Sequence, residues 1–165
     1  MTEYRVVIPE DRFRIVKFRQ ENMPGIAVVN EALAPFEPKV VFAWHLSIML
    51  QFEDLVLNGM PSQSERELVD SWGDLVDAAI KGENPDKPNA LFLARITWNA
   101  TRELIYHVYD PETVNQYLVH VIDSKSYPRN FNYRMEHDPE WELAKWQLSA
   151  GVCAKPDAPA DGGGI

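Results

Sequence analysis

The 165-residue chain contains one cysteine, Cys153, and no apolar run long enough to cross a membrane. A single cysteine excludes an intramolecular disulfide, and a free thiol fits a reducing compartment. A membrane-spanning helix needs about 20 consecutive apolar residues. The first 20 residues carry charges throughout and lack the apolar centre of a signal peptide. We therefore expect a cytoplasmic protein with no membrane segment.

Basic residues are scarce compared with acidic ones. Lys and Arg total 16 against 25 Asp and Glu, which gives a formal net charge of −9 and a pI near 4.9. Binding to nucleic acid draws most of its affinity from Lys and Arg on phosphates, so nucleic acid is not expected as the main ligand. The acidity favours solubility or a basic protein partner.

Motifs that carry familiar chemistry are also missing. The chain has no glycine-rich phosphate loop, no Gly-x-Ser-x-Gly turn and no Cys-His pairing. Its four histidines lack the spacing of metal ligands and stand at His45, His107, His120 and His137. We expect no metal, no cofactor and no catalytic residues, and a non-catalytic protein is favoured over an enzyme.

Composition predicts one domain over residues 1–150 and a flexible tail over residues 151–165. With 45% hydrophobic and 25% charged residues, the body resembles an ordinary globular domain. The tail is rich in Ala, Pro, Asp and Gly and has no apolar period, so nothing in it offsets the entropy of ordering.

The first half of the chain predicts a hairpin, a strand and a helix. Residues 12–19 and 25–30 read as strands joined by a Met23-Pro24-Gly25 turn. Residues 44–52 alternate apolar and polar, which is typical of a half-buried strand. Ser62 and Ser64 each begin a capping box. The following helix is expected to bury one stripe, namely Leu68, Trp72, Leu75, Val76, Ala79 and Ile80.

The second half predicts a hairpin and two capped helices around a further strand. If a two-residue turn joins residues 90–98 to 102–109, Arg95 lies opposite Tyr106. Asp110-Pro111-Glu112 and Asp138-Pro139-Glu140 each combine a capping Asp with an early Pro and so predict helix starts. Residues 130–136 form the strand between these helices.

From residue 44 onward, the order of elements is strand, helix, strand, strand, helix, strand. This order predicts an α+β fold with a ferredoxin-like antiparallel sheet and helices on one face. The two amino-terminal strands are expected to extend this sheet or to fold over it.

Four polar strand residues, His45, Arg95, Tyr106 and Arg134, are candidates for binding a small molecule or anion on the open sheet face. Strand alternation by itself also gathers polar residues on a solvated face. A buried Arg95 requires a partner, which a structural carboxylate would supply as readily as a substrate. Both interpretations stay open.

Trp98, Arg102 and Trp141 are candidates for contact with a protein partner. Five tryptophans are many for this length, and Trp is enriched at interfaces. Trp98 stands at a strand end, and Trp141 begins a short helix. Filling of the core is the alternative role for the two tryptophans.

Two segments, ARITWNATRELIYHVYD and FNYRMEHDPEWELAKW, resemble a bacterial family known as domain of unknown function 695. The resemblance extends to VVNEAL and AWHLSI, and so covers most residues between Gly25 and Leu148. The family has no established catalytic residues. Some relatives are fused to a domain like the regulator of ribonuclease E activity, where this chain has its tail. The resemblance implies a regulatory or binding module.

Two functions therefore remain as hypotheses. The first is a non-catalytic protein-binding or regulatory module with a basic target. The alternative is a small-molecule or anion-binding protein, or an enzyme, that uses the sheet face around His45, Arg95, Tyr106 and Arg134.

Overall fold

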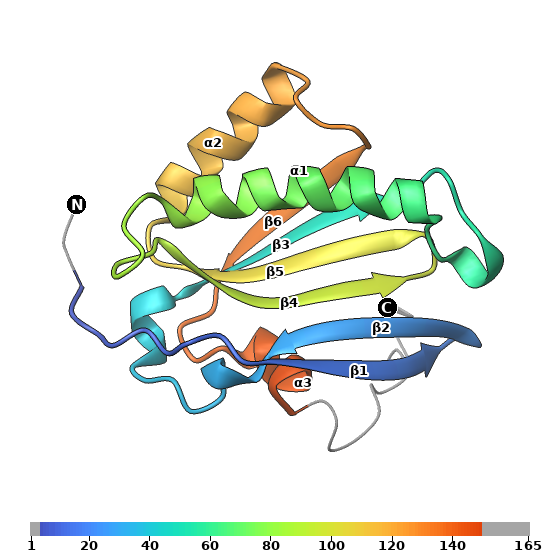
Figure 1. Ribbon diagram of the computed structural model, residues 1–165. Helices are drawn as coiled ribbons and strands as arrows, with labels where there is room; N and C mark the ends of the chain where they lie inside the picture. The colour runs from blue at the N-terminus through green and yellow to red at the C-terminus, as the bar shows by residue number, and fades with distance from the viewer. Residues whose placement is uncertain (1–3, 150–165) are drawn as a thin grey trace.

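The computed structural model describes residues 4–149, which form an α+β fold around one antiparallel sheet (Figure 1). The tail predicted over residues 151–165 lies outside the described residues. The strand order across the sheet is β1-β2-β4-β5-β3-β6. The strands are β1 (Phe13–Gln20), β2 (Met23–Asn30), β3 (Trp44–Gln51), β4 (Ala90–Trp98), β5 (Thr101–Val108) and β6 (Phe131–His137). The helices are α1 (Gln63–Lys81), α2 (Pro111–Asp123) and α3 (Lys145–Ser149).

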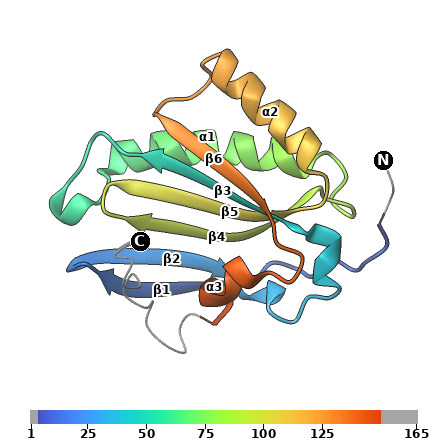
Figure 2. The same cartoon turned by 180° about the vertical axis from the view of Figure 1, so that it is seen from behind.

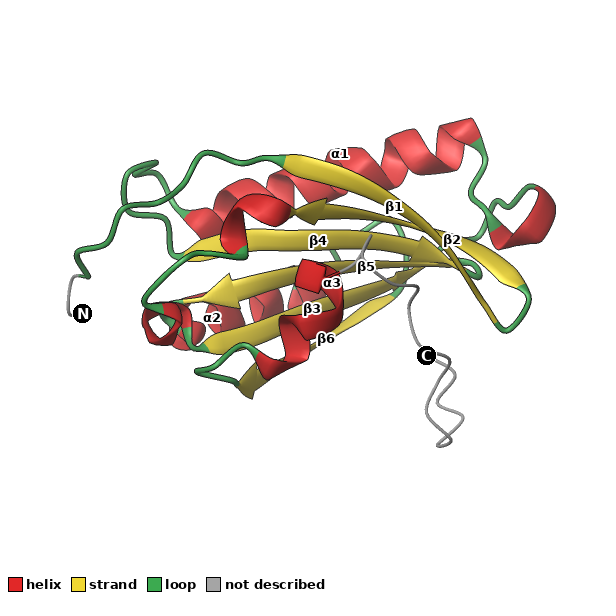
Figure 3. Ribbon diagram, turned by 90° about the horizontal axis from the view of Figure 1, so that it is seen from below, coloured by secondary structure: helices red, strands yellow, loops and turns green. Residues whose placement is uncertain are grey.

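The helices lie on both sides of the sheet. α1 and α2 cover one face, called the helix face, and α3 lies on the other, called the α3 face (Figures 1 and 3). The prediction of helices on one face therefore applies to α1 and α2 and is wrong for α3. The reason is that Trp141 and Ala144, just before α3, are buried in the hydrophobic cluster of the second face.

The amino-terminal hairpin extends the sheet, because β2 pairs with β4. Its turn is Glu21-Asn22, where both residues have positive φ (53° and 65°), and the predicted Met23-Pro24-Gly25 turn is wrong. Two positive φ values give the twist that a two-residue hairpin needs. Gly25 instead lies within β2, where the ring of Phe18 fills the space that a side chain would need.

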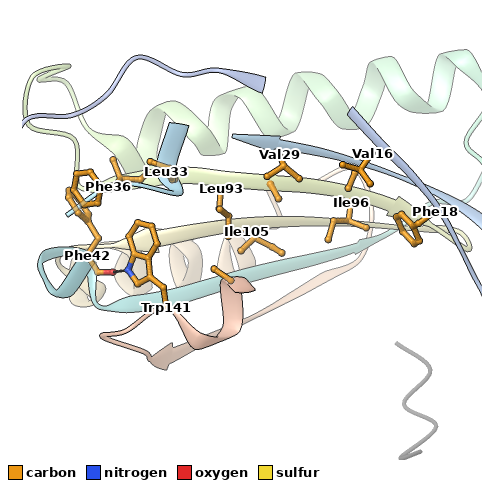
Figure 4. Close-up of a cluster of buried hydrophobic side chains, with 14 of the residues drawn as sticks. Val16, Phe18, Val29, Leu33, Phe36, Phe42, Leu93, Ile96, Ile105 and Trp141 are labelled. Atoms are coloured by element: carbon orange, nitrogen blue, oxygen red, sulfur yellow. Dashed lines mark hydrogen bonds between the residues drawn. The ribbon is translucent and has the colours of Figure 1, made fainter. Parts of the chain in front are cut away.

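Each sheet face has its own hydrophobic cluster. Figure 4 shows the cluster of the α3 face, in which side chains from the hairpin, the central strands and Trp141 meet. On the helix face, α1 buries Val69, Trp72, Val76 and Ile80 against β3 and β5. Leu75, predicted for the buried stripe, is 69% exposed.

Helix caps explain where two of the helices begin. The Glu65 amide donates to Ser62 Oγ at 3.1 Å, and the Glu112 amide donates to Asp110 Oδ1 at the same distance. The carboxylate of Asp138 also accepts two backbone amides, but from a 3-10 turn over Glu142–Ala144. α3 therefore starts later than predicted, at Lys145.

Candidate functional site

The four residues predicted to bind a ligand lie on two opposite faces of the sheet. Arg95 and Tyr106 lie on the helix face and line one cleft beside α1. His45 lies on the α3 face. Arg134 shares that face, because it pairs with Ser47, two residues along β3 from His45. The structure thus brings the four together as two pairs rather than as one site.

The β4–β5 hairpin differs from the predicted register by two residues. Its turn residues are Asn99 and Ala100, whose φ angles are 47° and 67°. Arg95 therefore lies opposite Leu104 rather than opposite Tyr106. A shift of two residues keeps every side chain on its face. Arg95 and Tyr106 consequently still share the helix face.

A bulge in β4 brings an aromatic and a basic side chain to the same face. The register shifts between Phe92 and Ala94, which leaves Leu93 as the extra residue. Leu93 and Ala94 are both fully buried in the α3-face cluster. The alternation therefore changes phase, so Phe92 and Arg95, three residues apart, both line the cleft on the helix face.

This cleft, with a volume of about 270 Å³, lies between α1 and the strands β4 and β5. Gly73 lines this cleft, and a Cβ at this position would meet only Leu104, at 3.8 Å. A larger side chain there would therefore extend into the cleft. Its apolar walls come from α1, β1 and β4. They include Trp72, Phe13 and Phe92.

One carboxylate of α1, that of Asp70, lies beside two arginines of the sheet. Arg102, with 4% of its surface exposed, donates through Nη1 to Asp70 Oδ1. Its Nε and Nη2 donate to Thr97 Oγ1 at 3.3 and 3.2 Å. Burial lowers the pKa of Arg102, and the charge of Asp70 opposes that effect. Arg95 Nη1 lies 4.0 Å from the same carboxylate.

A second carboxylate of α1 holds Tyr106. The phenol donates to Asp77 Oδ1 at 2.6 Å, and Lys81 Nζ lies 3.2 Å from Asp77 Oδ2. Burial raises the pKa of Tyr106, and the neighbouring charge of Asp77 raises it further. Tyr106 is therefore a neutral hydrogen-bond donor. The cleft is amphipathic, and its buried polar groups bond to each other.

The α3 face buries two histidines side by side. His107 is fully buried, and its ring stacks on Trp141 at a centroid distance of 4.0 Å. The ring of His45 meets His107 edge-on at 5.4 Å. Burial lowers the pKa of His107 to about 3 and also lowers that of His45. Both rings are consequently neutral at pH 7.

The three residues predicted to contact a partner are inside the fold. Trp141 is 1% exposed, and its Nε1 donates to the carbonyl of Phe42 at 2.9 Å (Figure 4). Trp98 is 7% exposed and donates to the carbonyl of Gln20 at 3.1 Å. Arg102 is held by Asp70. Trp98 and Trp141 are buried in the α3-face cluster, and Arg102 is buried on the helix face against α1.

Sequence reasoning missed the carboxylates that organise the cleft. Asp70, Asp74 and Asp77 are spaced by four and three residues, and helical geometry places such residues on one side. That spacing was the available signal. Sequence reasoning also missed an ion pair between Glu65 and Arg129. Glu65 is 2% exposed, and its Oε1 lies 2.7 Å from Arg129 Nη2.

Two features absent from residues 4–149 concern membrane segments and metal sites. No helix within that range has both the length and the apolar character required to cross a bilayer. The same residues place no group of three His, Cys, Asp or Glu side chains where a metal ion would be held. The fold and its site define an α+β protein with an amphipathic cleft beside a helix.

The chain belongs to the family of unknown function DUF695, whose sequence profile matches residues 14–145. The match covers β2 to β6 in full and β1 from its second residue, and it reaches the first residue of α3, which confirms the resemblance stated above. No curated protein and no solved structure matches the chain.

Proposed function

We propose that the chain is a non-catalytic protein-binding module, and that its partner docks on the outer side of the β1–β2 hairpin. The observation that carries this proposal is a group of large apolar side chains left in solvent. Phe13, Ile15 and Ile26 are 53%, 66% and 38% exposed. Clustered exposed apolar residues are typical of interaction sites.

These side chains share the helix face of the sheet, beyond the edge of α1. Ile15 pairs with Val28, which pairs with Arg95. Lys17 pairs in the same way with Ile26. We call Phe13, Ile15, Lys17 and Ile26 the hairpin surface. It borders the cleft, because Phe13 lines both.

The absence of a catalytic constellation in the cleft supports a binding role. Tyr106 donates a hydrogen bond to Asp77, and Arg102 is held by Asp70. General acid or base catalysis needs a group whose pKa lies near the working pH, and a buried phenol of raised pKa does not meet that need. The net charge of −9 supports a partner that is basic overall, since opposite charges steer association.

Site-specific cross-linking tests the docking surface. A photo-reactive amino acid at Ile15 is compared with one at Leu75, which is similarly exposed but lies on α1. We expect a protein cross-linked from position 15 only, identified by mass spectrometry and then titrated in purified form. Ile15→Ser should weaken that binding by about tenfold, roughly 1.4 kcal/mol. Identical products from both positions would overturn the proposal.

A second candidate function is binding of a small amphipathic molecule in the cleft. It is supported by the shared presence of Arg95, Tyr106 and two phenylalanines around one space of about 270 Å³. Trp72 also lines the cleft, so its fluorescence reports on occupancy. Gly73→Leu should fill the space and abolish a ligand-induced change, whereas Ala79→Leu, an exposed position on the same helix, should not.

We also propose that the part of the sheet from β3 to β6 is ferredoxin-like. The order β6-β3-β5-β4, with α1 and α2 on one face, supports this description. A cytoplasmic location is proposed on the sequence grounds given above, and fractionation of cells with a specific antibody tests it.

A further inference from the structure

We propose that the partner contributes an extended strand that carries apolar residues and an acidic residue at alternate positions, and that this strand adds to the free edge of β1. This inference rests on the proposed protein-binding function and specifies its chemistry. A strand that joins a sheet edge gains affinity from main-chain hydrogen bonds and specificity from alternate side chains.

The first argument is that β1 is an open edge (Figure 1). Glu31 donates its amide to the carbonyl of Arg12 at 2.9 Å, so Arg12 points its backbone groups toward β2. In an antiparallel ladder the orientation alternates from residue to residue. The backbone groups of Phe13, Ile15 and Lys17 therefore point away from β2. Among residues 4–149 they have no backbone hydrogen bond outside the ladder.

The second argument is that the same residues that offer backbone groups also present apolar side chains. Phe13 and Ile15 are exposed on the helix face next to the edge. The apolar residues of an added strand would lie beside them on this face, and burial of apolar surface stabilises the added strand. An added strand therefore covers apolar surface that the chain leaves in water.

The third argument is the charge of this strand. Residues 12–19 hold four basic residues, Arg12, Arg14, Lys17 and Arg19, and no acidic one, although the chain as a whole is acidic. Lys17 is exposed and has no ion pair among the described residues. Directly opposed unlike charges stabilise a strand pair, and like charges destabilise it.

Charge also argues against a second copy of this chain as the occupant. Two β1 strands joined antiparallel about a two-fold axis at Lys17 would place this residue against itself and Ile15 against Arg19. A two-fold axis at Ile15 avoids that repulsion but sets Lys17 against Phe13, where it has no opposite charge, because β1 carries no carboxylate. An acidic strand meets no such repulsion.

The opposite edge of the sheet, β6, exposes a different kind of side chain. The exposed residues of β6 are polar and of both signs, including Asn132, Arg134 and Glu136. Its apolar residues pack against the helix-face cluster. Native sheets protect their edges with charges. β6 follows that pattern on its exposed side, whereas β1 leaves Phe13 and Ile15 in solvent.

The test uses random peptides of eight residues, the length of β1, displayed on phage and selected against the full chain. We expect enriched peptides to carry, at alternate positions, apolar residues that face Phe13 and Ile15 and an acidic residue that faces Lys17. Each selected peptide is then synthesised with N-methyl groups on one alternate set of amides or on the other. Because only one set faces β1, one methylated form should lose about tenfold or more in affinity and the other should not.

Two protein variants distinguish the contribution of the Lys17 charge from that of the apolar side chain of Ile15. Lys17→Glu should weaken the acidic peptides by about tenfold, while Arg134→Glu on β6 is the matched control and should leave them unchanged. Ile15→Ser should also weaken binding. Hydrogen exchange at the amides of Ile15 and Lys17 should slow when peptide is bound.

The outcomes distinguish the inference from the proposed function. Equal effects of both methylation patterns, or the absence of any enriched acidic peptide, overturn strand addition. If Ile15→Ser still weakens binding of the cross-linked protein, the proposal of protein binding at the hairpin surface stands. If Ile15→Ser leaves binding of that protein unchanged, both strand addition and protein binding at the hairpin surface are overturned. A dimer in analytical ultracentrifugation that Ile15→Pro abolishes would instead make a second copy the occupant.

Discussion

The two faces of the sheet bury polar side chains of the same strand in different ways. On the helix face, β5 buries Arg102, which keeps its charge beside Asp70. On the α3 face, β5 buries His107, which lies between aromatic rings and gives up its charge, because burial lowers its pKa to about 3. The difference follows from chemistry: a guanidinium remains protonated at any ordinary pH, whereas an imidazole can be neutral.

This contrast sets the accessibility of each face. A face that buries fixed charge needs carboxylates from α1, and these line a cleft that solvent reaches. A face that buries neutral rings is sealed, and Trp141 closes it by stacking on His107 and on Phe36 at 5.8 Å (Figure 2 shows α3 across this side of the sheet). The helix face therefore has a cleft that is open to solvent, whereas the stacked rings of the α3 face are buried.

Removal of the ring that seals the α3 face should have the largest effect. Trp141→Ala deletes a side chain that is 1% exposed, and a change of this kind costs about 3–5 kcal/mol. Urea denaturation measures the free energy of unfolding. Leu143→Ala, at a position 45% exposed nearby, is the control and should cost under about 1 kcal/mol. Similar losses for the two variants would show that the face is not sealed by Trp141.

Acid should weaken the α3 face through His107. In the unfolded chain this group has its ordinary pKa of 6.5, and in the folded chain burial lowers the pKa to about 3. The unfolded state therefore binds the proton first, so stability is full above pH 6.5 and falls as the pH drops toward 3. The loss is up to about 1.4 kcal/mol per pH unit, or roughly 2 kcal/mol by pH 5.

Denaturation at pH 7 and pH 5 measures this dependence. His107→Phe keeps a ring against Trp141 and should flatten the stability curve between these two values. His120→Gln, at an exposed position on α2, is the control and should retain the wild-type slope. A slope that is unchanged in His107→Phe would assign the acid sensitivity to other groups.

Loss of a carboxylate should reveal the fixed charge on the helix face. Asp70→Ala leaves Arg102 buried without its partner, and breaking a buried ion pair costs about 3–5 kcal/mol. The side chain of Asp70 is 37% exposed, so solvent screening reduces this to about 2 kcal/mol. Asp74→Ala, one turn along α1, should cost under about 0.5 kcal/mol. Equal losses would show that Asp70 does not compensate Arg102.

Local sequence signals predicted a large part of the fold, because those signals act over a few residues. Ser62 and Asp110 cap the helices where the pattern placed them. Strand alternation placed Arg95 and Tyr106 on one face, even though the register was shifted. Such predictions need only the period of a strand or the first turn of a helix.

Tertiary context decided the rest. Leu75 fits the helical period as well as Val76 does, and only the position of α1 on the sheet decides which one is buried. The bulge at Leu93 and the left-handed φ of Trp141 (58°) have no local sequence signal. Sequence therefore suggested two halves of a site that the sheet keeps apart, and it missed Asp70, which reaches the cleft from another element.

The smallest effect should come from Arg134, which contrasts with Arg102 on the opposite face. The side chain of Arg134 is 76% exposed, and its nearest carboxylate, Glu136, lies 4.0 Å away. An exposed ion pair contributes about 0–1 kcal/mol, so Arg134→Gln should cost less than about 0.5 kcal/mol and its effect should shrink further in salt. Arg102→Gln should cost several times more, because it leaves Asp70 and Thr97 without their donor. If urea denaturation found the two substitutions equal, the sheet would not separate buried fixed charge from solvated charge, and the contrast between its faces would reduce to the histidines alone.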